Sequence, residues 1–141
     1  MRAVGIILAG GNSNKMRELT HKRAVAAMPI AGSYRAIDFA LSNMSNSHIQ
    51  KVAVLTQYNA RSLNEHLNSS KWWDFGRKQG GLYVFTPTIT AENGYWYRGT
   101  ADAIYQNLDF LKRCHEPYVI ITSGDAVYKM DYNKVLEYHI A

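Results

Sequence analysis

Short, unbroken runs of apolar residues recur along the chain and predict buried strands. The runs cover Val4–Ala9, Lys51–Thr56 and Tyr118–Thr122, with a weaker one at Gly81–Phe85. Runs of this length that do not alternate with polar residues are typical of strands buried on both faces. They therefore favour a parallel sheet that is covered by helices.

Between these runs, apolar residues recur at helical spacing. The pattern predicts helices over Tyr34–Ser42, Ala60–Leu67 and Thr100–Arg113. Strands that alternate with helices indicate an α/β fold with a mostly parallel sheet. We therefore expect a three-layer α/β sandwich.

The helix over Thr100–Arg113 has the clearest pattern. Thr100 is a suitable N-cap, and Lys112 and Arg113 fall in the last turn, where cations complement the helix dipole. The apolar stripe expected to face the core consists of Ala101, Ile104, Leu108 and Leu111.

The end of the chain carries the start of another amphipathic helix. Asp131 is a suitable N-cap, and Val135, Leu136 and Tyr138 begin an apolar stripe that stops at Ala141. This ending is typical of the N-terminal part of a longer protein. It predicts a stripe that is left partly exposed.

Composition narrows the class of protein. The 141 residues are 47% hydrophobic and 19% charged, which favours a folded domain over a disordered chain. The net charge of +5 suits a phosphate-bearing ligand, but it is not gathered into a basic run that would indicate nucleic acid. No apolar run has the length of a membrane span or the form of a signal peptide, so we expect a cytoplasmic protein. Cys114 is the only cysteine, and the histidines match no zinc motif.

The loop after the first strand is a candidate phosphate-binding site. It contains Gly10 and Gly11, whose N–H groups can approach a phosphate without a Cβ in the way. The loop matches neither the GxGxxG pattern nor a Walker A motif. A tight strand-to-helix turn without a ligand explains it equally well.

Two further loops carry candidate residues. Asp125 follows the third apolar run, where a carboxylate can hold Mg²⁺ beside a phosphate or simply cap a turn. The aromatic loop Glu92–Thr100 leads into a helix N-terminus that suits a polar ligand, although packing over the sheet explains it slightly better. Because ligands of open α/β sheets bind at the carboxyl ends of strands, we expect the loops to meet in one cleft. The residues expected there are Gly10, Gly11, Arg98, Gly99 and Asp125.

The segment Asp38–Asn46 places polar residues among apolar ones. We interpret Ser42, Asn43 and Asn46 as structural residues that cap helix ends and fix loops.

Several motifs follow one another along the chain. They include Leu8-Ala-Gly-Gly11, Ile37-Asp-Phe-Ala-Leu-Ser-Asn43, Trp96-Tyr-Arg-Gly-Thr-Ala-Asp-Ala103 and Gly124-Asp125. This ordered series resembles the bacterial glucose-1-phosphate adenylyltransferase family, also called ADP-glucose pyrophosphorylase, over nearly the whole chain. The resemblance implies a Rossmann-like (GT-A-like) nucleotidyltransferase domain. Residues 1–141 would be its N-terminal part, without the left-handed β-helix domain that ends the family's subunits.

The family makes ADP-glucose and diphosphate from ATP and glucose 1-phosphate in glycogen biosynthesis. The resemblance implies a metal and catalytic role for Asp125 with Mg²⁺, and a catalytic role for Lys15, which stands at the family's arginine position. Lys22 and Arg23 are candidates for contacts with an effector or a phosphate. The residues matching the nucleotide-binding stretches are Leu8, Ala9, Gly10, Gly11, Arg98, Gly99, Thr100 and Ala101.

Three positions depart from the pattern of active family members. Lys15 replaces an arginine and loses its bidentate fork, Val25 replaces a lysine, and Ser13 replaces a glycine. These losses resemble the non-catalytic, GlgD-type partner subunit, which implies weak or no activity alone and a hetero-oligomer with a catalytic subunit. Two alternatives stay open. One is an active adenylyltransferase in which Lys15 suffices, and the other is a different sugar-nucleotidyltransferase.

Overall fold

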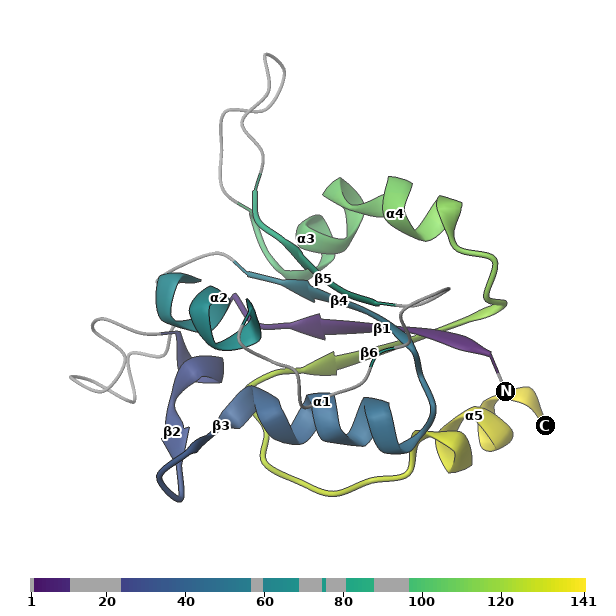
Figure 1. Cartoon of the computed structure of the whole chain (residues 1–141). Helices are drawn as coiled ribbons and strands as arrows, with labels where there is room; N and C mark the ends of the chain where they lie inside the picture. Colours follow the sequence, from purple (N-terminus) through teal and green to yellow (C-terminus); the bar gives the residue numbers. More distant parts are fainter. Residues whose placement is uncertain (1, 11–23, 57–59, 69–74, 76–80, 88–96) are drawn as a thin grey trace, which may run out of the picture.

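The computed structural model describes residues 2–10, 24–56, 60–68, 75, 81–87 and 97–141. In this part of the chain, a four-stranded parallel sheet forms the centre of the molecule (Figure 1). Its strands are β1 (Ala3–Leu8), β4 (Lys51–Leu55), β5 (Gly81–Phe85) and β6 (Tyr118–Ser123). They lie in the order β5-β4-β1-β6, which is the Rossmann-like order for four successive strands.

The unbroken apolar runs predicted all four strands to within one residue at each end. The pattern works because β1 is buried on both faces, with Val4, Ile6 and Ile7 almost fully covered. In register, Ile6 lies beside Ala53 of β4 and Ile121 of β6.

Helices cover both faces of the sheet, which confirms the three-layer α/β sandwich (Figure 1). One face carries α1 (Ala36–Asn46), α2 (Ala60–Asn68) and α5 (Tyr132–Ile140). The other carries α3 (Thr100–Gln106) and α4 (Leu108–Arg113).

The larger core lies between the sheet and α1, α2 and α5. There Ile37, Leu41 and Met44 of α1 pack with Leu63 of α2 and Tyr132 of α5. The smaller core lies under α3 and α4, and it joins Ile6, Leu55, Tyr97 and Ala103.

The single helix expected over Thr100–Arg113 is wrong, because the chain breaks into α3 and α4 at Asn107. The Asn107 amide donates to Ala103 O at 2.7 Å and to Tyr97 Oη at 3.0 Å, so its side chain competes with the helical backbone. The N-cap of α3 is Gly99, and Thr100 is the first helical residue. Ala101, expected in the apolar stripe, is exposed, and Ala103 is buried in its place.

Helix α1 begins later and ends later than expected. Tyr34–Arg35 form strand β3, which pairs with β2 (Pro29–Ile30) in a hairpin that the sequence did not indicate. The helix begins after Arg35, because the Asp38 carboxylate accepts the Arg35 N–H at 2.8 Å.

The last helix agrees with its prediction. Asp131 caps α5 by accepting the Asn133 N–H at 3.0 Å. Its stripe is partly exposed, since Leu136 is buried whereas Val135 and Ile140 are about half exposed. None of the helices in the described ranges is both long and apolar enough to cross a bilayer.

Candidate functional site

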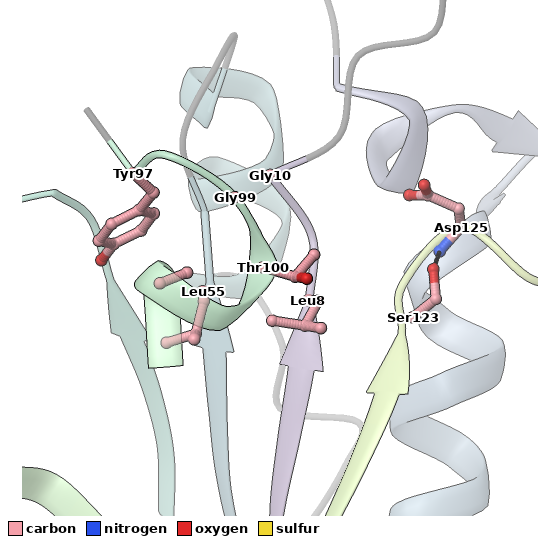
Figure 2. Close-up of a pocket in the computed structure, with 9 residues that line it drawn as sticks. Leu8, Gly10, Leu55, Tyr97, Gly99, Thr100, Ser123 and Asp125 are labelled. Atoms are coloured by element: carbon pink, nitrogen blue, oxygen red, sulfur yellow. Dashed lines mark hydrogen bonds between the residues drawn. The ribbon is translucent and has the colours of Figure 1, made fainter. Parts of the chain in front are cut away.

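An open pocket lies across the carboxyl ends of β4, β1 and β6 (Figure 2). The described residues enclose a volume of about 260 Å³. This edge of an open α/β sheet is where ligands of such folds bind. Residues from four separate parts of the chain line the pocket: Leu8, Gly10, Leu55, Tyr97, Gly99, Thr100, Ala103, Ser123 and Asp125.

Five of the residues expected at a nucleotide site meet in this pocket. They are Leu8, Gly10, Gly99, Thr100 and Asp125. Figure 2 shows Ser123 and Asp125 on one side of Leu8, and Tyr97, Gly99 and Thr100 on the other.

Three other expected residues do not line it. Ala9 is fully buried beneath it, and its N–H donates to Leu55 O at 2.9 Å. Arg98 and Ala101 are exposed at the start of α3. The expected residues Gly11, Lys15, Lys22 and Arg23 lie outside the described ranges.

The side chains of α3 and Asn107 hold the wall formed by Tyr97–Thr100. Asp102 accepts the Arg98 N–H at 2.8 Å and the Gln106 amide at 2.9 Å. Burial raises the pKa of Tyr97 above its ordinary value, so its hydroxyl stays protonated at neutral pH. Tyr97 therefore offers the pocket a fixed, uncharged side chain.

Gly99 gives this wall an open approach. Its φ of 155° belongs to a region that is essentially restricted to glycine. A Cβ added there would face open space, with no atom within 4 Å. Strain therefore accounts for the glycine, and a ligand can come close to this backbone.

The opposite wall is held against β1 by Gly124. Its N–H donates to Leu8 O at 2.9 Å, and the next N–H, of Asp125, donates to Ser123 Oγ at 3.1 Å (Figure 2). A Cβ on Gly124 would lie 3.2–3.3 Å from Ile7 Cγ2, Ala9 Cβ and Ala26 Cβ. The close approach favours glycine, because a larger residue would have to displace these neighbours, and it packs the backbone that carries Asp125 against β1.

The Asp125 carboxyl is poorly solvated although the residue as a whole is exposed. Desolvation raises its pKa above the ordinary 3.8, which means that its charged form lacks favourable surroundings. In the described ranges, no three His, Cys, Asp or Glu side chains lie close enough together to hold a metal ion. A single carboxylate fits Mg²⁺ in a nucleotide site, because this ion keeps several waters and takes its other ligands from phosphates.

A short 3₁₀ helix, η2 (Val25–Ala27), lies against the wall that carries Gly124 and Asp125. Arg35 Nη1 donates to Ala27 O at 2.7 Å, and Asp38 Oδ1 lies 2.6 Å from His66 Nε2. The Arg35 side chain thus holds the end of η2, in which Val25 is half-buried, and the Asp38–His66 pair joins α1 to α2 beside it.

Tyr97 and Ser123 lie in segments that the sequence offered as candidates, whereas sequence reasoning missed Leu55 and Ala103 as lining residues. Leu55 ends its strand, so the rule that ligands bind at the carboxyl ends of strands could have found it. Ala103 could not be found in that way, because its place depends on how α3 packs on the sheet.

Residues 4–141 match the model of a family described as nucleotidyl transferase. The chain is 49% identical over 138 residues to the glucose-1-phosphate adenylyltransferase of Thermosipho africanus, covering 98% of this chain and 34% of that protein. It is 50% identical over 136 residues to the enzyme of the same name from Clostridium perfringens strain SM101, covering 96% and 35%. The corresponding figures for Clostridium novyi are 46% over 136 residues, covering 96% and 36%. The chain thus spans about a third of the length of the curated relatives it matches.

Proposed function

This chain belongs to the nucleotidyl transferase family, and on that basis we propose that it forms the nucleotide-binding part of a protein of ADP-glucose synthesis. The proposed reaction converts ATP and glucose 1-phosphate to ADP-glucose and diphosphate in glycogen biosynthesis. The name shared by its relatives supports this choice of reaction. The observation that carries the proposal is that Asp125 lines one pocket with Leu8 and Gly10 at the carboxyl ends of the strands.

The lining of the pocket suits a nucleotide. Leu8, Leu55 and Tyr97 supply apolar surface for a flat base. The Thr100 hydroxyl and the Gly99 backbone supply polar groups on the same wall. Gly10 leaves room for a phosphate to approach the end of β1.

In the proposed reaction, a phosphate oxygen of glucose 1-phosphate attacks the α-phosphorus of ATP. The bond from the α-phosphorus to the oxygen that bridges to the β-phosphate breaks, and diphosphate leaves with that electron pair. The protein forms no covalent bond, so positioning and charge stabilisation supply the rate. Asp125 would hold Mg²⁺, which neutralises phosphate charge when bound.

We further propose that this protein is the low-activity, regulatory type of subunit, acting in the cytoplasm in a hetero-oligomer with a catalytic subunit. The support is chemical: Val25 provides no charge, and Lys15 lacks the fork of arginine. If each transition-state cation contributes on the order of 10²–10³-fold, weakening one and deleting another costs roughly 3 to 6 kcal/mol of barrier stabilisation.

An active adenylyltransferase is the second candidate. Relatives that are 46–50% identical carry the name of the enzyme, which favours this reading. Lys15 also keeps a positive charge at the family's arginine position.

The test is an assay of the full protein, alone and together with a catalytic subunit, for ADP-glucose formation and for ATP binding. The regulatory reading expects ATP binding with little turnover alone, and altered turnover in the mixture. Turnover alone that equals a catalytic subunit's would favour the second candidate. Asp125→Asn should weaken ATP binding in the presence of Mg²⁺, whereas the charge-matched control Asp109→Asn, on the exposed side of α4, should not.

A further inference from the structure

The segment that joins β6 to α5 runs along helix α1 (Figure 1). Asp125 lies near its start, and Tyr132 begins α5 at its end. Three backbone groups between Tyr128 and Tyr132 form hydrogen bonds with two side chains. One of these side chains lies on α1 and the other at its C-terminal end. The bonded residues are more than 80 positions apart in the sequence.

Asn43 makes two of these bonds. Its Nδ2 donates to Tyr128 O at 3.0 Å, and its Oδ1 accepts the Met130 N–H at 3.1 Å. Asn43 is only 3% exposed, so its amide makes both bonds away from bulk water. Its amide therefore holds two backbone groups at once, as a neighbouring strand would.

Ser47, one helical turn further along, makes the third bond. Its Oγ accepts the Tyr132 N–H at 2.9 Å, and the residue is 1% exposed. Asn43 and Ser47 together form what we call the α1 clamp.

Three hydroxyl groups, hydrogen-bonded in a row, link β6 to α5 through Tyr128. Tyr128 Oη lies 2.7 Å from Thr122 Oγ1 in β6 and 2.7 Å from Tyr132 Oη in α5. Burial raises the pKa of Tyr132 to about 12, so the hydroxyl stays protonated at neutral pH. The end of β6 and the start of α5 are thus joined to each other, and the segment between them is also bonded to α1.

On the N-terminal side of Asp125, Gly124 fixes the backbone. The Gly124 N–H is bonded to Leu8 O, and the glycine is wedged against Ile7, Ala9 and Ala26. Residues 125–127 are exposed between these two anchors. Because both ends of this short stretch are fixed, its backbone can move little, and this limits where the Asp125 carboxylate can lie.

We propose that Asn43 and Ser47 are positioning residues, which act through the backbone of residues 128–132 to hold Asp125 at the edge of the pocket. The functional part of this inference rests on the proposed function. The mechanical part, that the clamp controls the backbone around Asp125, does not.

The mechanical part is tested by hydrogen exchange in the full protein. In Asn43→Ala, the Gly124 and Asp125 amides, which are bonded to Leu8 O and Ser123 Oγ, should exchange roughly ten- to thirty-fold faster in peptides that cover residues 124–127, as expected for the loss of two hydrogen bonds. Peptides from β1 and β4 should be less affected. The matched control is Leu41→Ala, because Leu41 is fully buried in the same helix and contacts the core. Unchanged exchange at residues 124–127 in Asn43→Ala, or equal acceleration there in Leu41→Ala, would overturn the proposal.

A milder pair of variants covers the case in which Asn43→Ala does not fold. Asn43→Asp keeps the size and the acceptor for Met130, but removes the donor to Tyr128. Ser47→Ala removes only the acceptor for Tyr132. Tryptic cleavage after Lys129, which is exposed between the two backbone groups held by Asn43, should be faster in both. Cleavage at the wild-type rate in both would contradict the clamp.

The functional part is tested by Mn²⁺ binding, measured by electron paramagnetic resonance with ATP present. Asp125→Asn and Asn43→Ala should each raise the Mn²⁺ dissociation constant several-fold, whereas Leu41→Ala should not. A rise in Asp125→Asn without a rise in Asn43→Ala would overturn the positioning role. If Asp125→Asn has no effect, the proposed metal role of Asp125 is wrong, and the hydrogen-exchange comparison decides the clamp by itself.

Discussion

Gly124 and Ala26 pack closely, since a Cβ on Gly124 would lie only 3.3 Å from the Cβ of Ala26. This contact joins one wall of the candidate site to η2, which packs behind it. Gly124 precedes Asp125 at the end of β6, and Ala26 belongs to η2, the short helix that contains Val25. The position of the Asp125 carboxylate thus depends on the position of η2.

The first prediction concerns this contact. Gly124→Ala should lower the free energy of unfolding by about 1–3 kcal/mol, because the added methyl overpacks against Ile7, Ala9 and Ala26. Urea denaturation measures the change. Adding Ala26→Gly removes one of the clashing groups, so the double variant should recover part of the loss. A purely additive double variant would show that the strain lies elsewhere.

The second prediction concerns the pair Asp38 and His66, which joins α1 to α2. His66→Ala should cost about 1–3 kcal/mol of stability, because the Asp38 carboxylate is 8% exposed and loses a partner at 2.6 Å. The matched control is Arg61→Ala, which breaks the exposed pair with Glu65 in the same helix and should cost under about 0.5 kcal/mol. Equal losses in the two variants, measured by thermal unfolding, would contradict a structural role for the buried pair.

The third prediction concerns the pH dependence of stability at Asp125. Its pKa is raised in the folded state, so the folded protein binds the proton more tightly than the unfolded chain does. The charged form of Asp125 therefore lowers the free energy of unfolding. This loss is complete at pH values above the raised pKa and absent at pH values below the ordinary 3.8. Asp125→Asn should be more stable than the wild type at pH 7, and the difference should vanish as the pH falls below 3.8.

Denaturation at a series of pH values checks this sign. Asp109→Asn, on an exposed part of α4, serves as the control and should show no such trend. A variant that is less stable than the wild type at pH 7 would mean that Asp125 has a stabilising partner.

The sheet could be predicted from the sequence because its signal is local. Val4, Ile6 and Ile7 lie in a run without polar residues, and only burial on both faces accommodates such a run. The break at Asn107 could not be predicted in this way. It depends on a hydrogen bond to Tyr97 Oη, and that contact exists only after α3 has packed.

The candidate site divides in the same way. Gly10 and Asp125 could be predicted because each follows a strand, and parallel strands bring their carboxyl ends to one edge. The contacts of Asn43 could be predicted only in part, and those of Ser47 not at all. The sequence suggested that Asn43 fixes a loop, but not that the loop lies 85 residues away and carries Asp125.

The last prediction concerns activity. Lys15→Arg together with Val25→Lys should raise kcat more than it lowers KM, because cations at these positions act mainly on the charge that develops in the transition state. Each single change should recover less, since the two cations would neutralise one phosphate chain jointly. Steady-state assay of ADP-glucose formation by the full protein measures the effect, with the wild type and both single variants in parallel.

The outcomes of this assay separate three explanations. A wild type that already turns over as fast as a catalytic subunit contradicts the regulatory reading, because the substitutions then cost nothing. A slow wild type that gains nothing from the double change places the defect elsewhere. Ser13 is then the next position to restore, as Ser13→Gly, because glycine lacks the Cβ that hinders close approach of a backbone to phosphate. A gain in kcat that requires both changes supports the charge argument, since Asp125 is present in every variant and the phosphate cations alone have been restored.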